Sequence, residues 1–108
     1  MTVRPTTDPD VLHDEERHRY ELRADGAVVA VADYEHERGA IAIVHTEVAP
    51  ERRRSGLAGR VVRAALNDVA ASGRRVVPVC PYVVAYIHHH PEYAELVDAP
   101  GEPPGSSA

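Results

Sequence analysis

The stretch from Leu57 to Val69 constrains the fold most, because its apolar residues recur at the period of an α-helix. The segments 40–48 and 74–80, on either side of it, are rich in β-branched residues and indicate strands. Gly73 is expected to end the helix, which begins near Ser55 or Gly56. A strand, a crossover helix and a further strand predict one parallel strand pair.

A second constraint is Asp25-Gly26, a two-residue turn signal between two strand-like runs of the stretch 19–35. The segment "HERG" is expected to end the second of these strands, and the strand 40–48 then returns antiparallel to it. Pro50 stops that strand, because proline has no N–H to donate. Residues 81–90 indicate a short helix with Pro81 near its start, and residues 91–97 a turn or a further helix.

Strict alternation along 40–48 predicts which side chains share a face of the sheet. One face would carry Ile41, Ile43, His45 and Glu47, and the other Ala42, Val44, Thr46 and Val48.

The predicted elements follow in the order β-β-β-α-β-α, which indicates an α+β (mixed α/β) fold of antiparallel hairpins followed by β-α-β-α. The 108 residues suffice for one small domain, which we assign to residues 13–97. Residues 1–12 have no periodic pattern, and residues 98–108 are rich in proline, glycine and serine. Both ends are therefore expected to be disordered tails.

Composition excludes several functions. The formal net charge of −5 argues against a general nucleic-acid binder. All twelve basic residues are arginine, so no lysine can form a Schiff base or a P-loop contact. Cys80 is the only cysteine, so no internal disulfide forms. The chain shows no signal peptide and no apolar run of membrane-spanning length, so we expect a cytoplasmic protein without a membrane partner.

The densest positive charge, Arg52 to Arg54, stands immediately before Ser55-Gly56 at the start of the predicted helix. A helix N-terminus presents unpaired N–H groups and partial positive charge, and glycine lets a ligand approach the backbone closely. The stretch therefore indicates a pyrophosphate site, with a solvated arginine run as the alternative. A P-loop is excluded because no Gly-Lys-Ser/Thr follows, and only one of the three Rossmann glycines is present.

The segment "EVAPERRRSGLAGRVVRAAL" resembles the acyl-CoA-binding segment of the GNAT superfamily of N-acetyltransferases. The family pattern Arg/Gln-x-x-Gly-x-Gly/Ala is filled by Arg53, Gly56 and Ala58, although Arg54 stands where many members have glycine. Further resemblance in "VVPVCPYV" and "YIHHHPEY" points to the short Yjdj-type branch, which lacks the N-terminal strand-helix-helix portion of larger members.

This resemblance implies a GNAT-like fold, with parallel strands that we expect to splay after Val48, and acetyl-CoA as co-substrate. It implies transfer of an acyl group directly from CoA to an amine acceptor. The residues expected to bind CoA are Val48, Arg53, Arg54, Ser55, Gly56, Leu57 and Ala58.

Direct transfer to an amine calls for a base and for an acid that protonates the leaving thiolate. Glu47 and His45, just before the arginine loop, are the candidate bases; a surface glutamate and a hydrogen-bonded strand histidine are the alternatives. Tyr86 resembles the GNAT tyrosine that protonates the thiolate, with core packing as its alternative. Cys80 is a further candidate for the chemistry and is expected near the thioester. Its alternative is a buried inert thiol.

No metal site is predicted at His88 to His90, because three adjacent helical positions cannot clasp one ion. The second functional hypothesis is a non-catalytic CoA-binding module, and the third is a small interaction protein. The expected partners are acetyl-CoA and an amine, and the protein is expected to be a monomer or a weak homodimer.

Overall fold

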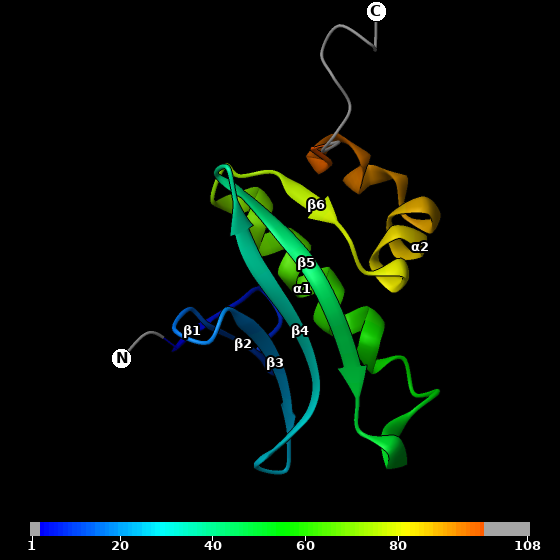
Figure 1. Ribbon diagram of the computed structural model, residues 1–108. Helices are drawn as coiled ribbons and strands as arrows, with labels where there is room; N and C mark the ends of the chain where they lie inside the picture. Colours follow the sequence, from blue (N-terminus) through cyan, green and yellow to red (C-terminus); the bar gives the residue numbers. More distant parts are fainter. Residues whose placement is uncertain (1–2, 99–108) are drawn as a thin grey trace, which may run out of the picture.

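The structure, a computed structural model, describes residues 3–98 and contains one six-stranded sheet with its strands in chain order (Figure 1). Neighbouring strands are antiparallel except for the last pair, which is parallel. The elements are β1 (Val3–Pro5), β2 (Val11–Asp14), β3 (Arg19–Ala24), β4 (Ala27–Glu37), β5 (Ala40–Val48), η1 (Pro50–Arg52), α1 (Leu57–Ala71), β6 (Val76–Pro78), α2 (Pro81–His89) and η2 (Pro91–Leu96). The predicted α+β class and the order β-β-β-α-β-α are confirmed for β3 to α2.

Two tight turns build the central hairpins. Asp25 and Gly26 have φ values of 53° and 80°, as a type I′ turn requires, so the predicted turn is confirmed. Arg38 and Gly39 repeat the arrangement with 52° and 82°. The second strand therefore ends at Glu37, within the segment "HERG" as predicted.

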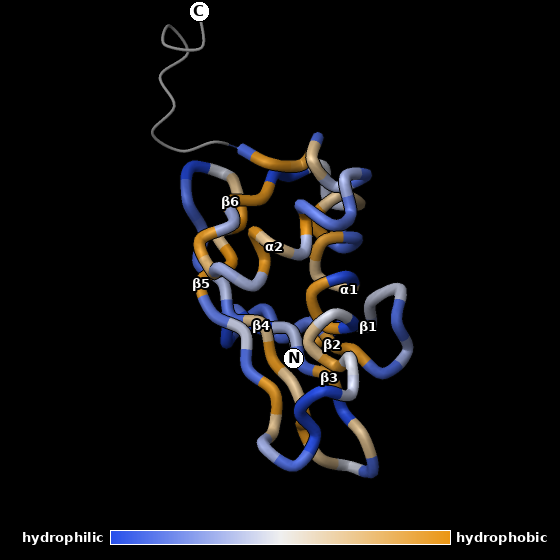
Figure 2. The backbone as a smooth tube through the Cα atoms, turned by 90° about the vertical axis from the view of Figure 1, so that its right-hand side faces the viewer, coloured by the Kyte–Doolittle hydropathy of each residue, from blue (hydrophilic) through white to orange (hydrophobic). Residues whose placement is uncertain are grey.

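Helix α1 packs against one face of the sheet, behind β4 and β5 in Figure 1. Its apolar stripe is buried as predicted, in a core shared with β2 to β6 and with Val83 and Ile87 of α2. The buried residues of α1 are Val61, Val62, Ala64, Ala65, Leu66 and Val69. Figure 2 shows these hydrophobic stretches on the strands and on α1, with hydrophilic residues in the turns.

The predicted faces of β5 are wrong beyond Ile43, because the strand contains a β-bulge. Ile43 pairs with Tyr34 and His45 pairs with Asp33, so Val44 is an extra residue between them. The bulge returns Thr46 and Val48 to the face of Ile41 and Ile43, which is the face that α1 covers. His45 and Glu47 consequently lie on the opposite face, which we call the open face.

The parallel strands separate earlier than predicted. Pairing of β5 with β6 covers only Ile41 to Ile43, not the strand as far as Val48. Pro78 has no N–H, and the next two N–H groups, of Val79 and Cys80, both donate to the carbonyl of Ile43 at 3.1 and 3.0 Å. The chain then turns into α2, so β5 from Val44 to Val48 has no strand on that side.

The structure corrects the predicted N-terminal tail, because β1 and β2 lie within or overlap residues 1–12. Val11 is fully buried, and Asp8 and Asp10 in the preceding loop accept hydrogen bonds from Arg60 of α1 at 2.8 to 3.0 Å. These partners lie some fifty residues away in sequence, so the local pattern gave no sign of them. Of the predicted C-terminal tail, residues 99–108 lie outside the described residues.

Candidate functional site

The N-terminus of α1 presents its backbone to open space. Gly56 is the N-cap, with a left-handed φ of 80°, and no side chain among residues 3–98 caps the helix. A Cβ placed on Gly56 would meet no atom within 4 Å. Glycine is thus required here by the backbone conformation, and the first N–H groups of α1 face a space that a ligand can enter.

The loop before this helix is held by its own backbone. The Arg53 N–H donates to the Pro50 carbonyl, and the Ser55 hydroxyl donates to the Arg52 carbonyl. Arg54 adopts a left-handed φ of 67°. Arg54 and Gly56, the left-handed residues on either side of Ser55, turn the chain sharply into α1, and the Arg53 and Arg54 side chains are exposed.

Two hollows join the loop to the unpaired stretch of β5. One, of about 460 Å³, is lined by His45, Thr46, Glu47, Val48, Arg53 and Ala58. The other, of about 200 Å³, is lined by Val48, Arg52, Arg53, Arg54, Gly56, Leu57, Ala58 and Tyr82. Because both share Val48, Arg53 and Ala58, we treat them as one β5–α1 groove.

The unpaired edge of β5 offers backbone hydrogen bonds to this groove. The Ala49 N–H donates to the Val29 carbonyl at 2.8 Å, which marks these two residues as a hydrogen-bonded pair. Such pairs alternate along an antiparallel ladder, so the N–H and C=O groups of Val48 and Thr46 point away from β4. The Thr46 N–H faces the Cys80 thiol, so an extended ligand chain can pair with the Thr46 carbonyl and with the N–H and C=O groups of Val48.

The groove is electropositive near α1. Arg52 lies 3.7 Å from a carboxylate oxygen of Asp25. Among residues 3–98 no carboxylate lies within 4.0 Å of Arg53 or Arg54. Two unneutralised guanidinium groups beside a helix N-terminus favour an anion with several oxygens, such as a phosphate ester.

Every predicted CoA-binding residue except Ser55 lines the groove. The candidate bases lie on its other flank, where the His45 Nε2 atom is 3.1 Å from the Glu47 Oε1 atom. Both side chains are more than half exposed, at 55% and 64%. The bulge at Val44 sets this arrangement, because it turns the pair toward the open face while Thr46 and Val48 face α1.

Cys80 is buried at the start of α2, with its Sγ atom 3.5 Å from the Thr46 hydroxyl. Burial by itself raises the pKa of the thiol. The Thr46 hydroxyl and the backbone N–H groups of Val83, Tyr82 and Thr46 outweigh burial, and the pKa lies below its ordinary value. The thiol is thus beside the lining residue Thr46 but does not itself line the groove.

Tyr86 lies one helical turn beyond the groove. Its ring is stacked on His90, with centroids 4.0 Å apart, and faces Gly59 in the first turn of α1. Burial raises the pKa of its phenol. Cys80 thus contacts β5 and Tyr86 faces α1, and the groove lining contains neither.

Sequence reasoning missed Tyr82, which lines the groove and also faces Gly59. The sequence spacing could have indicated Tyr82, because it lies four residues before Tyr86 and the two share a face of α2. Of the three adjacent histidines, His88 and His89 are exposed, and His90 Nδ1 lies 2.9 Å from the Tyr86 carbonyl oxygen. Over the described residues 3–98, no helix is long and apolar enough to cross a membrane.

Comparisons with solved structures return proteins of related fold. A GCN5-like protein from Staphylococcus aureus, described as a candidate N-acetyltransferase, aligns with 76% of this chain and 82% of its own, at 14% identity and a TM-score of 0.61. The aminoglycoside N-acetyltransferase AAC(6')-Iy in complex with CoA aligns with 78% of this chain and 66% of its own, at 17% identity and a TM-score of 0.47. A second crystal form of that complex aligns with 86% of this chain and 63% of the AAC(6')-Iy chain, at 15% identity and a TM-score of 0.48.

The comparison with curated proteins found no match. The sequence profile of the family described as GCN5-related N-acetyl-transferase matches residues 19–96, which is most of the chain and runs from β3 to η2. This match includes the bulged strand, the arginine loop and both helices of the groove. The chain therefore belongs to the GCN5-related N-acetyltransferase family.

Proposed function

We propose that the protein is an acetyl-CoA-dependent N-acetyltransferase that transfers an acyl group directly from CoA to an amine. The observation that carries this proposal is the β5–α1 groove, where an unpaired strand edge leads to an uncapped helix N-terminus beside Arg53 and Arg54. A pyrophosphate fits the helix end and the arginines. The amide-bearing pantetheine arm fits the backbone groups of Val48 and the carbonyl of Thr46.

The open face supplies the base for the acceptor. A lysine-like amine has a pKa of about 10.4, so nearly all of it is protonated at pH 7. Glu47, with His45 beside it, takes the proton, and the neutral nitrogen attacks the thioester carbonyl carbon. The C–N bond forms as the C–S bond breaks, and the nitrogen releases its second proton to solvent. The thiolate of CoA takes a proton from an acid, which solvent then reprotonates. Donor and acceptor in this scheme approach β5 from opposite faces.

For the acid we propose Tyr86, whose half-buried phenol has a raised pKa and stays protonated at neutral pH. Cys80 and Tyr82 are the alternatives, because Cys80 contacts Thr46 and Tyr82 lines the groove. We further propose that the protein acts in the cytoplasm.

Calorimetric titration with acetyl-CoA tests the site. Gly56→Asp would place a carboxylate at the helix N-terminus and is expected to weaken binding at least tenfold. Gly39→Asp is the matched control, because Gly39 has a φ of 82° and equally open surroundings but lies in the β4–β5 turn. Equal acetyl-CoA affinity of the two variants would contradict the site.

Release of free CoA in the presence of an amine panel then tests the activity. Binding of acetyl-CoA without release of CoA under any of these conditions would favour the non-catalytic CoA-binding module instead.

A further inference from the structure

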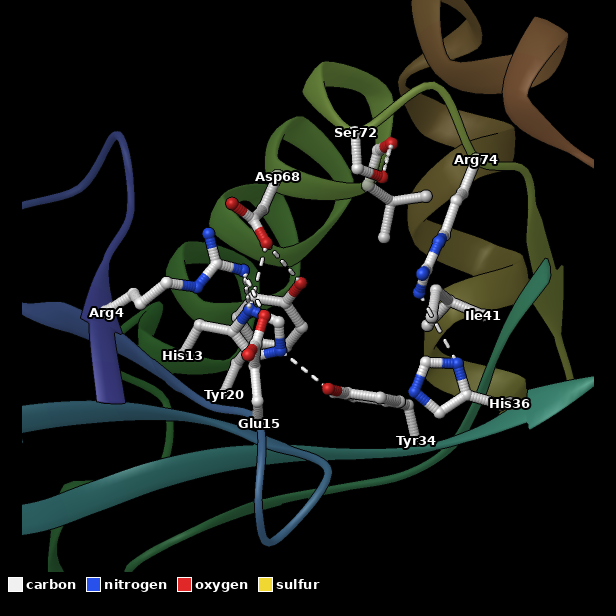
Figure 3. Close-up of a pocket in the computed structure, with 11 residues that line it drawn as sticks. Arg4, His13, Glu15, Tyr20, Tyr34, His36, Ile41, Asp68, Ser72 and Arg74 are labelled. Atoms are coloured by element: carbon white, nitrogen blue, oxygen red, sulfur yellow. Dashed lines mark hydrogen bonds and ion pairs between the residues drawn. The ribbon is translucent and has the colours of Figure 1, made fainter. Parts of the chain in front are cut away.

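A second cavity, of about 340 Å³, lies between the carboxyl-terminal half of α1 and strands β2 to β5 (Figure 3). It shares no lining residue with the β5–α1 groove. Asp68, which lines it, follows Leu57 by eleven helical residues, so it lies about 17 Å along α1 from the start of that helix. We call it the polar cavity, and its volume is in the lower range of small-molecule sites.

One wall of the polar cavity is fixed by a hydrogen-bond network. The Tyr20 hydroxyl donates to the Asp68 carboxylate at 2.6 Å, and His13 Nδ1 lies 3.1 Å from the same oxygen. The other nitrogen of His13 is 2.6 Å from the Tyr34 hydroxyl. The rings of His13 and Tyr20 are stacked 4.2 Å apart. These contacts hold the wall in one arrangement without a ligand.

Charge is distributed unequally across the cavity. Asp68 and Glu15 lie on one side, where Arg4 pairs with Glu15 at 2.6 Å. Burial lowers the pKa of His13, which leaves that imidazole neutral near pH 7. Two carboxylates and one guanidinium give this side one excess negative charge.

The opposite side carries a positive charge. Figure 3 shows Arg74 and His36 across the cavity from Asp68 and Glu15. Arg74 lies 3.4 Å from His36 Nδ1 and has no carboxylate within 4.0 Å among residues 3–98. Burial and the neighbouring His18 and Arg74 lower the pKa of His36, so this imidazole is also neutral. The guanidinium of Arg74 therefore remains as an uncompensated cation over the cavity.

Besides Ser72, whose hydroxyl donates to the Val69 carbonyl, the remaining lining is apolar and comes from Ile41, Val69 and the tyrosine rings. We propose that the polar cavity binds a free α-amino acid with an apolar side chain. Its ammonium group pairs with Asp68 and Glu15, its carboxylate with Arg74, and its side chain lies against Ile41 and Val69. Tertiary packing alone accounts for the Tyr20–Asp68 bond, but within residues 3–98 it gives Arg74 only the neutral His36 ring and no anionic partner. This site is independent of acyl transfer in the groove.

Calorimetry and NMR titration of the full chain test this proposal with L-alanine, L-valine, L-leucine and L-phenylalanine. At least one of the four is expected to bind and to shift the signals of His13 and Tyr34. For L-leucine the single-charge analogues are 4-methylpentanoate, which lacks the amine, and 3-methylbutylamine, which lacks the carboxylate. Each is expected to bind at least tenfold more weakly than the amino acid. Absence of binding by all four, or equal binding of the analogues, would overturn the proposal.

Two variants locate the site. Arg74→Gln changes an exposed loop residue and is expected to weaken amino-acid binding at least tenfold without changing the melting temperature. Arg38→Gln, in the exposed β4–β5 turn, is the matched control and should bind as the unaltered chain does. Asp68→Asn should also weaken binding, but it disturbs the Tyr20 bond, so its melting curve is measured first. Unchanged affinity in Arg74→Gln would contradict the assignment.

Discussion

The Cys80 thiol lies 3.5 Å from the Thr46 hydroxyl, and this contact joins the start of α2 to the unpaired stretch of β5. It depends on the bulge at Val44, because without that extra residue the Thr46 side chain would point to the open face. The same contact helps to lower the pKa of Cys80.

The first prediction concerns the reactivity of this thiol. A lowered pKa means that the thiolate forms at lower pH than in an unperturbed cysteine, whose pKa is 9.0. The rate of iodoacetamide alkylation against pH should therefore have its midpoint below that value. Thr46→Val removes the hydroxyl at nearly constant shape and should move the midpoint upward. Thr7→Val is the control, since Thr7 lies in the β1–β2 loop. Identical profiles for the two variants would show that Thr46 has no influence on the thiol.

Much of the fold could be predicted from local sequence. Asp25-Gly26 specifies its turn through backbone conformation alone, and α1 shows its buried stripe in the spacing of its apolar residues. The arginine loop could also be placed, because a strand, a proline and a glycine before a helix are adjacent in the chain. These features depend on interactions within a few residues, which a sequence pattern records.

The features that sequence missed depend on distant partners. Valine is equally suited to a regular strand and to a bulge, so Val44 gave no warning that the faces of β5 exchange. Tyr20 and Asp68 are 48 residues apart, and only the packing of α1 on β3 brings them together. Strand β1 likewise exists because β2 offers it an edge.

The second prediction concerns the acid that protonates the thiolate. Tyr86→Phe is expected to lower turnover roughly 10²-fold while acetyl-CoA affinity stays nearly unchanged, as for loss of a positioned acid. Because burial raises the pKa of Tyr86, the phenol stays protonated through neutral pH, and its ionisation should reduce activity only above its ordinary value near pH 10. Steady-state rates across pH measure both effects.

Two further variants identify the acid if Tyr86 is not it. Tyr82→Phe and Cys80→Ala change the groove-lining tyrosine and the thiol beside Thr46. Full turnover in Tyr86→Phe together with a large loss in one of these would transfer the role to that residue.

The third prediction concerns the base. Glu47→Gln should lower kcat roughly 10²-fold with little change in acetyl-CoA affinity, because the carboxylate removes a proton from the acceptor and lies on the flank of the groove that faces the open face. His45→Gln should give a smaller loss, since the imidazole acts beside Glu47 at 3.1 Å. Glu35→Gln is the matched control, because this exposed residue of β4 does not line the groove. Equal rates for Glu47→Gln and Glu35→Gln would rule out Glu47 as the base.

The last prediction concerns the N-terminal strands. Arg60 donates two hydrogen bonds to Asp8 and one to Asp10, so it fastens the β1–β2 loop to α1. Arg60→Gln should lower the free energy of unfolding by about 1 kcal/mol, the upper range for an ion pair of this exposure. Arg38→Gln is the control, because Arg38 lies in the exposed β4–β5 turn and has no carboxylate within 4.0 Å among residues 3–98. The bond to Arg60 lowers the pKa of Asp8 below its value in the unfolded chain. The stabilising contribution of this ion pair is therefore complete above about pH 4, the pKa of Asp8 in the unfolded chain. It is lost as the pH falls through the lower pKa of the folded chain.

Urea unfolding at a series of pH values tests this prediction. The free energies of unfolding of the two variants should differ at pH 7 and converge in acid. A difference that persists after Asp8 is protonated would mean that Arg60 stabilises the fold by packing and not by its ion pair.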